Sequence, residues 1–240
     1  MKLTNLHIGY STTLLEIQEL NLEAGKIYAL IGANGRGKTT FMKTLIGQIP
    51  AISGGISIGN KASSVLSPIE KSKLFGFVQS RFAGVPYMKA KEYVALGRSP
   101  YTNAFGRLST KDEDIVNQSF STLEIEHLAD KFTEELSDGE RQMLAIAKVL
   151  TQETQYIFLD EPTAFLDYSN KKKVLDKLTE IAIKLKKTIV YSSHDLELTL
   201  GHSDELVCIA HEGNDVRSFR KNEIEFEGLV RFCFGVNSPN

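Results

Sequence analysis

The sequence predicts an α/β domain built on a mostly parallel sheet, with a helical subdomain inserted in it. Short apolar runs alternate with helical patterns in both halves of the chain, which is typical of βαβ units. The stretch from Tyr87 to Leu150 contains helical patterns without a convincing strand between them. We expect a single domain with a core over about 1–85 and 151–220, a helical subdomain over about 86–150 and a C-terminal tail over about 221–240.

The expected elements follow in order. The strands share short apolar runs and cover residues 26–32, 74–79, 155–160, 188–193 and 205–210. The core helices cover residues 39–48, 169–185 and 195–200, and those of the subdomain cover 89–96, 109–123 and 139–150. Ser67 to Glu70 form a capping box with Pro68 at the first helical position, which starts one more short helix. Residues 236–240 are expected to be a loose tail.

Composition limits the class of protein. The chain has 240 residues, 42% of them hydrophobic, which is enough for one buried core or a core with a subdomain. A net charge of −2 gives no positive field that would attract nucleic acid. The cationic run Lys171 to Lys173 is either a solvated helix face or a binding patch, and we favour the solvated face.

Cysteine usage and hydropathy indicate the compartment. Cys208 and Cys233 both lie in apolar runs, which indicates free thiols in a reducing compartment. No apolar run approaches the roughly 18 to 20 residues that cross a bilayer, and the N-terminus lacks a signal-peptide core. We expect a cytoplasmic protein that is free to dock on a membrane protein.

A glycine-rich loop joins the strand over 26–32 to its helix. Gly32 to Thr39 match the pattern G-x-x-x-x-G-K-[ST] in the strand-to-helix context that its mechanism requires. Glycines let backbone N–H groups surround an anion, and the helix adds its positive dipole end. Lys38 would contact the β- and γ-phosphates, and the Thr39 hydroxyl would bind Mg²⁺. The alternative, a glycine turn before Lys-Thr, is disfavoured by the context, so we expect a bound nucleoside triphosphate.

Two adjacent carboxylates end the strand over 155–160. Asp160 and Glu161 lie at a carboxyl end of the sheet, where α/β proteins bind their ligands. We expect Asp160 to hold Mg²⁺ through water and Glu161 to act as the general base for an attacking water. Acidic turn residues without a role are the alternative. A metal carboxylate beside a base favours hydrolysis over transfer to an acceptor.

Leu136 to Gln142, with the sequence LSDGERQ, resembles the signature motif of ABC (ATP-binding cassette) ATPases. On its own residues, the same stretch is a capping box, with Ser137 as N-cap and Glu140 three residues later. The resemblance implies a phosphate-loop ATPase core with an N-terminal antiparallel β part. It also implies that this helix N-terminus faces the γ-phosphate of an ATP bound to a partner subunit. The family usually has Gly and Gln where this chain has Asp138 and Glu140. We expect these two carboxylates to weaken that contact and Arg141 to offset them.

The resemblance extends to about Ala210 and implies roles for further residues. Tyr10 would stack on adenine, Gln79 would sense Mg²⁺ and the attacking water, and His194 would contact the γ-phosphate. Taken alone, Tyr10 reads as a strand-end aromatic and His194 as a capping or core residue. Residues 164–167 resemble the loop that crosses to the partner's site. Arg36 replaces a usual Ser, Ala or Cys, and we expect its side chain to face solvent or a partner subunit.

The expected site therefore has three groups of residues. Those expected to act in catalysis are Lys38, Gln79, Glu161 and His194. Those expected to bind ATP are Tyr10, Asn34, Gly35, Arg36, Gly37, Lys38, Thr39, Thr40, Ser137, Asp138, Gly139 and Glu140. Those expected to hold Mg²⁺ are Thr39, Gln79 and Asp160.

A single cassette without a membrane span favours a separate subunit that forms a homodimer and acts on other chains. Tyr93 to Val116 resembles a segment of importers for iron-siderophore complexes, haem and cobalamin, although a Gly/Pro-rich loop between helices is the simpler reading. The resemblance implies that the chain docks on permease subunits at the inner face of the cell membrane. It also implies an indirect partnership with a substrate-binding protein. The alternatives are another ABC transporter class, a non-transport ABC ATPase and an ATP-binding regulator without turnover, and Glu161 and His194 argue against the last.

Overall fold

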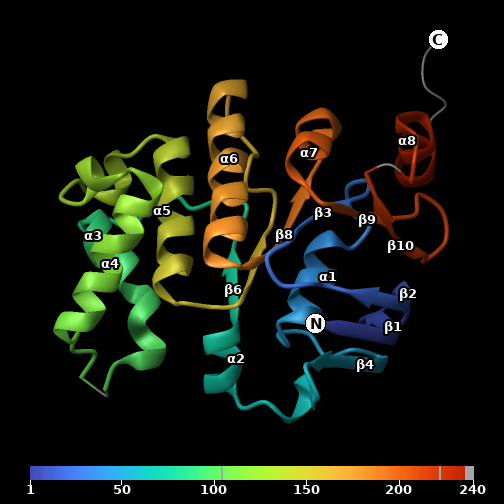
Figure 1. Cartoon of the computed structure of the whole chain (residues 1–240), viewed down its shortest axis with the longest axis horizontal. Coiled ribbons are helices and arrows are strands. Elements are labelled where there is room, and N and C mark those ends of the chain that lie inside the picture. Colours follow the sequence, from blue (N-terminus) through green and yellow to red (C-terminus); the bar gives the residue numbers. More distant parts are fainter. Residues whose placement is uncertain (104, 222, 236–240) are drawn as a thin grey trace.

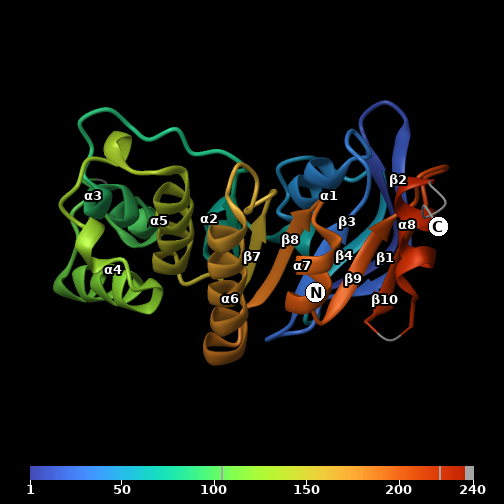
Figure 2. The same cartoon turned by 90° about the horizontal axis from the view of Figure 1, so that it is seen from above.

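The computed structural model describes residues 1–103, 105–221 and 223–235, and the loose tail expected over 236–240 lies outside them. The broader tail expected over about 221–240 is wrong for residues 226–234, which form a helix whose Leu229 and Cys233 are buried. Two sheets and their helices occupy one end of the elongated molecule, and helices α3, α4 and α5 occupy the other (Figures 1 and 2). This arrangement confirms the predicted α/β class. Within the described residues, no helix is long and apolar enough to cross a membrane.

The smaller sheet is antiparallel and contains the N-terminus. Its strands lie in the order β2-β1-β4-β5. Their bounds are β1 Lys2–Gly9, β2 Thr13–Asn21, β4 Ser53–Ile58 and β5 Lys61–Ala62. In β1 and β2, buried apolar side chains alternate with polar ones, as a sheet with one covered face requires. The antiparallel N-terminal part that the resemblance implied is thus present.

The larger sheet has the order β10-β9-β3-β8-β7-β6. Its strands are β3 Ile27–Ile31, β6 Phe75–Val78, β7 Tyr156–Leu159, β8 Thr188–Ser193, β9 Glu205–Ile209 and β10 Val216–Arg220. Strands β6, β7, β8, β3 and β9 are mutually parallel, so their carboxyl ends share one edge. The five strands expected from apolar runs are observed, and the unpredicted β10 pairs antiparallel with β9 at the edge.

Helices cover both faces of this sheet. In the core they are α1 Lys38–Leu45, α2 Pro68–Leu74, α6 Tyr168–Leu185, α7 Leu196–His202 and α8 Phe226–Phe234. Ser67 and Glu70 form the expected capping box of α2. Alternate residues of β3 divide the core: Ala29 and Ile31 face a cluster shared with α5 and α6, while Tyr28 and Leu30 face one shared with α1 and the small sheet. The loop after β3 is thus held between two packed layers.

The helical subdomain follows β6. It contains α3 Ala90–Ala95, α4 Thr110–Leu123 and α5 Asp138–Thr151, with short 3-10 helices η2 Leu96–Tyr101, η3 Glu126–Leu128 and η4 Thr133–Glu135. Another 3-10 turn, η1 Ser63–Val65, precedes α2. Helix α5 packs against α3 and α4 on one side and α6 on the other, and its middle is almost entirely buried. It therefore joins the subdomain to the core.

Candidate nucleotide-binding and catalytic site

The loop from Gly32 to Gly37 connects β3 to α1 and depends on its glycines. Gly35 and Gly37 have φ angles of +76° and +96°, in the left-handed region that favours glycine. A Cβ on Gly37 would also lie 2.6 Å from the Leu14 side chain. Asn34 and Gly35 are exposed at the tip, and Thr40 is half-buried in the first turn of α1. The loop has the turned backbone and the helix start that a phosphate cradle requires.

Lys38 is buried at the start of α1. Its Nζ donates to the carbonyl oxygens of Gly32 at 2.8 Å and Ala33 at 3.2 Å. Burial lowers the pKa of Lys38, and the nearby carboxylates of Glu161 and Asp160 oppose that fall. The ammonium group is therefore held inside the loop, where it can meet an anion.

Asp160 lies beside the Thr39 hydroxyl, which donates to its Oδ2 at 2.6 Å. A carboxylate and a hydroxyl are the hard oxygen donors that Mg²⁺ prefers, so this pair fits the expected ion. Gln79 follows β6, which pairs with β7, so it lies at the same sheet edge. Its side chain is exposed, and within the described residues no hydrogen bond joins it to Asp160.

Glu161 contacts two other predicted site residues. Its Oε1 lies 2.6 Å from His194 Nε2 and 4.0 Å from Lys38 Nζ. The backbone of Glu161 has a φ of +48°, which is strained for a residue with a side chain. In this structure His194 therefore contacts the carboxylate of Glu161, and both groups lie beside the phosphate loop.

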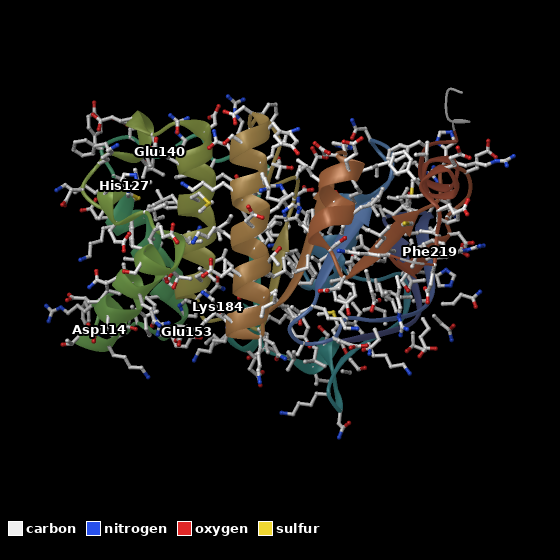
Figure 3. All side chains as sticks on the ribbon, turned by 45° about the horizontal axis from the view of Figure 1, so that its top comes forward. Asp114, His127, Glu140, Glu153, Lys184 and Phe219 are labelled. Carbon is white, nitrogen blue, oxygen red and sulfur yellow. The ribbon has the colours of Figure 1, made fainter. Side chains whose placement is uncertain are left out.

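Ser137 to Glu140 start α5 with the expected capping box. Ser137 Oγ accepts from the Glu140 N–H, and the Glu140 carboxylate accepts from the Ser137 N–H at 2.8 Å and from its hydroxyl at 2.7 Å. These bonds lower the pKa of Glu140. In Figure 3, Glu140 lies at the same end of the subdomain as His127 and opposite Glu153. Arg141 contacts Asp138 at 3.4 Å and donates mainly to backbone carbonyls of η4. It therefore offsets Asp138, whereas Glu140 has its cap and Lys131 Nζ at 3.7 Å.

The start of α5 is separated from the phosphate loop. Strand β6 lies between α5 and α1 in Figure 1, and its neighbour β7 lies between them in Figure 2. Within the described residues, no hydrogen bond or ion pair joins residues 137–140 to residues 32–40. One chain therefore brings Lys38, Thr39, Asp160, Glu161 and His194 together but leaves Ser137 to Glu140 apart.

The expectation that Arg36 faces solvent or a partner subunit is wrong. Its Nε and Nη2 donate to the Ala210 carbonyl at 3.2 and 3.0 Å, and Nη2 also donates to the Gly213 carbonyl. These carbonyls belong to the turn after β9, which is next to β3 in the sheet. The side chain is half-buried and ties the phosphate loop to this turn because its planar group can reach two carbonyls at once.

Other predicted positions lie in the surrounding loops. Tyr10 is 72% exposed in the β1–β2 connection, which leaves its ring free for stacking. Asp167, at the end of the 164–167 loop, caps α6 by accepting from the Asn170 N–H at 2.8 Å. Lys172 and Lys173 are exposed as expected, but Lys171 is half-buried and contacts Asp195 at 3.3 Å, so the solvated-face interpretation is wrong for Lys171.

Ser192 on β8 is a site residue that the sequence did not predict. Its hydroxyl donates to Asp160 Oδ1 at 2.9 Å and accepts from the Glu161 N–H at 2.8 Å. A buried serine in an apolar strand gives only a weak signal. The signal that could have found it is its place near the carboxyl end of a central strand, where the site residues gather.

Residues 15–164 match the family model described as ABC transporter. This chain belongs to the ABC transporter family. It is similar to an uncharacterized ABC transporter ATP-binding protein of Methanocaldococcus jannaschii, at 36% identity over 100% of this chain and 83% of the relative. The ferric enterobactin transport ATP-binding protein FepC of Escherichia coli is 30% identical over 96% of this chain and 85% of its own. A solved inward-facing ABC transporter, described as metal-chelate type, has a TM-score of 0.86 at 25% identity and covers 98% of this chain and 89% of that chain.

Membership of this family gives the general activity. The chain is the ATP-binding subunit of an ABC transporter, and its hydrolysis of ATP drives transport.

Proposed function

We propose that this chain is the ATP-hydrolysing subunit of an importer for metal chelates, with an iron chelate, haem or cobalamin as cargo. Two relatives support this class: one is named for ferric enterobactin transport, and one solved structure is of the metal-chelate type. Tyr93 to Val116 adds a sequence resemblance to the same importers. The proposed location is the cytoplasmic face of the membrane, against permease subunits that receive cargo from a substrate-binding protein.

The arrangement around Glu161 is the observation that supports hydrolysis most strongly. Lys38 lies where it would bind the β- and γ-phosphates, 4.0 Å from the Glu161 carboxylate. Thr39 and Asp160 would hold Mg²⁺, which neutralises phosphate charge when bound. Glu161 would accept the proton of the attacking water, and His194 would fix the direction of that carboxylate through their 2.6 Å contact. Gln79, at the same edge, would contact the ion and the water.

We propose that the complete site forms between two copies of the chain. The start of α5 has no phosphate loop of the same chain beside it, because strands of the larger sheet lie between α5 and α1 (Figures 1 and 2). A helix N-terminus favours an anion, so Ser137 and Gly139 would bind the γ-phosphate held by Lys38 of the other copy. Tyr10 and the loop residues 34–40 would hold the rest of that ATP.

The proposed permease contact is the groove between Gln79 and the segment from about Tyr87 to Arg98, which belongs to the helical subdomain. Closure of the dimer would move this segment together with α5 and so move the membrane subunits. Cysteines introduced at Val85 or Lys89, which are half-buried, should cross-link to a permease in membranes. Cross-linking confined to Lys172, on the exposed face of α6, would contradict this contact.

Replacement of Glu161 by Gln tests the proposed reaction. The wild-type chain should hydrolyse Mg-ATP, and Glu161→Gln should lose at least about 100-fold in kcat, since general-base catalysis contributes roughly 10²–10⁴-fold. ATP affinity should change little because Lys38 and the loop are untouched. Glu113→Gln, at an exposed position of α4, is the matched control and should behave as wild type. Wild-type turnover in Glu161→Gln would remove Glu161 from the role of base.

A further inference from the structure

We propose that Ser192 is a positioning residue for ATP hydrolysis, because its single hydroxyl fixes both Asp160 and Glu161. This inference rests on the proposed function, in which Asp160 helps to hold Mg²⁺ and Glu161 activates water. Ser192 itself would touch neither ATP nor the reacting water.

The strand order brings Ser192 to this place. Strand β8 lies between β7 and β3, with Leu159 paired to Tyr191 and Leu30 paired to Ser192. Strand β7 ends at Leu159, so Asp160 and Glu161 leave the ladder beside Ser192. The serine side chain is fully buried, which holds its hydroxyl in one environment.

The hydroxyl uses both of its hydrogen-bonding functions. It donates to Asp160 Oδ1 at 2.9 Å, while Thr39 donates to Oδ2 at 2.6 Å. A carboxylate held at both oxygens cannot rotate about its χ2 angle without breaking one of these bonds. Ser192 therefore fixes the orientation of Asp160 toward Thr39.

The same oxygen accepts from the Glu161 N–H at 2.8 Å. Glu161 has a φ of +48°, a conformation that persists only where its surroundings enforce it. With this backbone, the carboxylate of Glu161 contacts His194 at 2.6 Å and points toward Lys38. Loss of the Ser192 oxygen would leave the N–H without this partner and loosen the residue that holds the proposed base.

A serine that only stabilises the strand is the alternative, and Thr188 provides the matched comparison. Thr188 lies on the same strand, is fully buried, and donates to the Glu23 carbonyl at 3.0 Å. Its hydroxyl contacts neither Asp160 nor Glu161. Thr188→Val therefore removes a buried hydroxyl bond from β8 without disturbing the two carboxylates.

The experiment compares Ser192→Ala, Ser192→Cys and Ser192→Thr with Thr188→Val and wild type. For each we measure kcat and KM for ATP, and the affinity for Mn²⁺ in the presence of ADP by electron paramagnetic resonance. Partners that orient metal ligands typically contribute roughly 10- to 100-fold to metal affinity or activity. Ser192→Ala should lose kcat by that factor and bind Mn²⁺ about tenfold more weakly, with KM changed less than threefold.

Ser192→Cys keeps the volume but weakens both hydrogen bonds, so the same losses are expected in a side chain that still packs. Ser192→Thr keeps the hydroxyl and should recover most of the activity. Thr188→Val should lower the stability of the fold while its kcat and its Mn²⁺ affinity stay at the wild-type values. Ser192→Ala with wild-type kcat and Mn²⁺ affinity would overturn the inference. If the wild type hydrolyses no ATP, the proposed function fails, and the Mn²⁺ affinities still decide whether Ser192 positions Asp160.

Discussion

Arg98 is expected to be one of the most sensitive structural positions of the helical subdomain. It is 3% exposed and lies in η2, within the segment that resembles metal-chelate importers. Its Nε donates to Asp112 at 2.8 Å, and its Nη1 donates to the Thr151 carbonyl and to Glu153, both at 2.7 Å. One guanidinium group thus joins η2, the start of α4 and the end of α5. Replacement by Met keeps the apolar stem and removes all of these bonds.

The expected loss of unfolding free energy depends on the carboxylates that Arg98→Met leaves without their partner. Removal of one partner of a buried ion pair typically costs about 3–5 kcal/mol, because the other charge remains without compensation. Asp112 keeps hydrogen bonds from the Ser109 N–H and hydroxyl, and Glu153 is half-exposed. The lower end of the range therefore applies, about 3 kcal/mol. For a chain of this size that corresponds to a fall in Tm of roughly 6–12 °C.

Urea unfolding and thermal scans would measure the change. Lys184→Met is the matched control: it breaks a 2.6 Å pair with Glu180, but Lys184 is 70% exposed. An exposed pair contributes less than about 1 kcal/mol, so Tm should change little. In the double variant Arg98→Met with Asp112→Asn the loss should be smaller than the sum of the two single losses, because the two side chains share one ion pair. A loss below about 1 kcal/mol in Arg98→Met would refute this reasoning.

Three other side chains give outcomes that can be measured separately. Hydrogen bonds from Ser109, and then Arg98, lower the pKa of Asp112 to about 2, so its contribution to the free energy of unfolding is present above about pH 4 and lost toward pH 2. Asp112→Asn should remove roughly 2 kcal/mol of this acid-dependent free energy, and an unchanged pH dependence of unfolding would contradict this. Arg36→Ala should cost about 1–2 kcal/mol in urea unfolding, and full stability would contradict its anchoring to the turn after β9. The neighbouring Cys233 thiol and burial raise the pKa of Cys208, so thiol reagents should modify it only after unfolding, and rapid reaction of the folded chain would contradict its burial.

The parts of the fold that sequence predicted have strong local signals. The central strands are continuous apolar runs because both faces are covered, and the starts of α2 and α5 are marked by capping boxes. Strand β10, with the sequence VRSFR, lies at an edge and is mostly exposed, so its apolar signal is weak. Helix α8 contains Gly228, starts without a side-chain cap and is rich in aromatic residues, so its burial against β9 rather than its propensity decides its structure.

The candidate site, like the fold, contains some residues that the sequence predicted and others that it did not. Residues 32–39 and the pair Asp160 and Glu161 are contiguous motifs, so the spacing of their side chains along the chain already indicates their chemistry. The contacts of Ser192 and Arg36 were not predictable, because they depend on which strands are neighbours in the sheet. Strand β8 lies beside β7 and β9 beside β3, and no local pattern encodes that order.

Sedimentation of the Glu161→Gln protein with and without Mg-ATP tests the central claim most directly. If the start of α5 binds an ATP held by another copy, this variant should be a monomer without nucleotide and a dimer with it. Adding Ser137→Arg should block the dimer by its bulk, while the monomer keeps its ATP affinity because Tyr10, Lys38 and Thr39 are untouched. A monomer at saturating Mg-ATP, or a tenfold loss of monomer ATP affinity in Ser137→Arg, about 1.4 kcal/mol, would contradict a site shared between two chains.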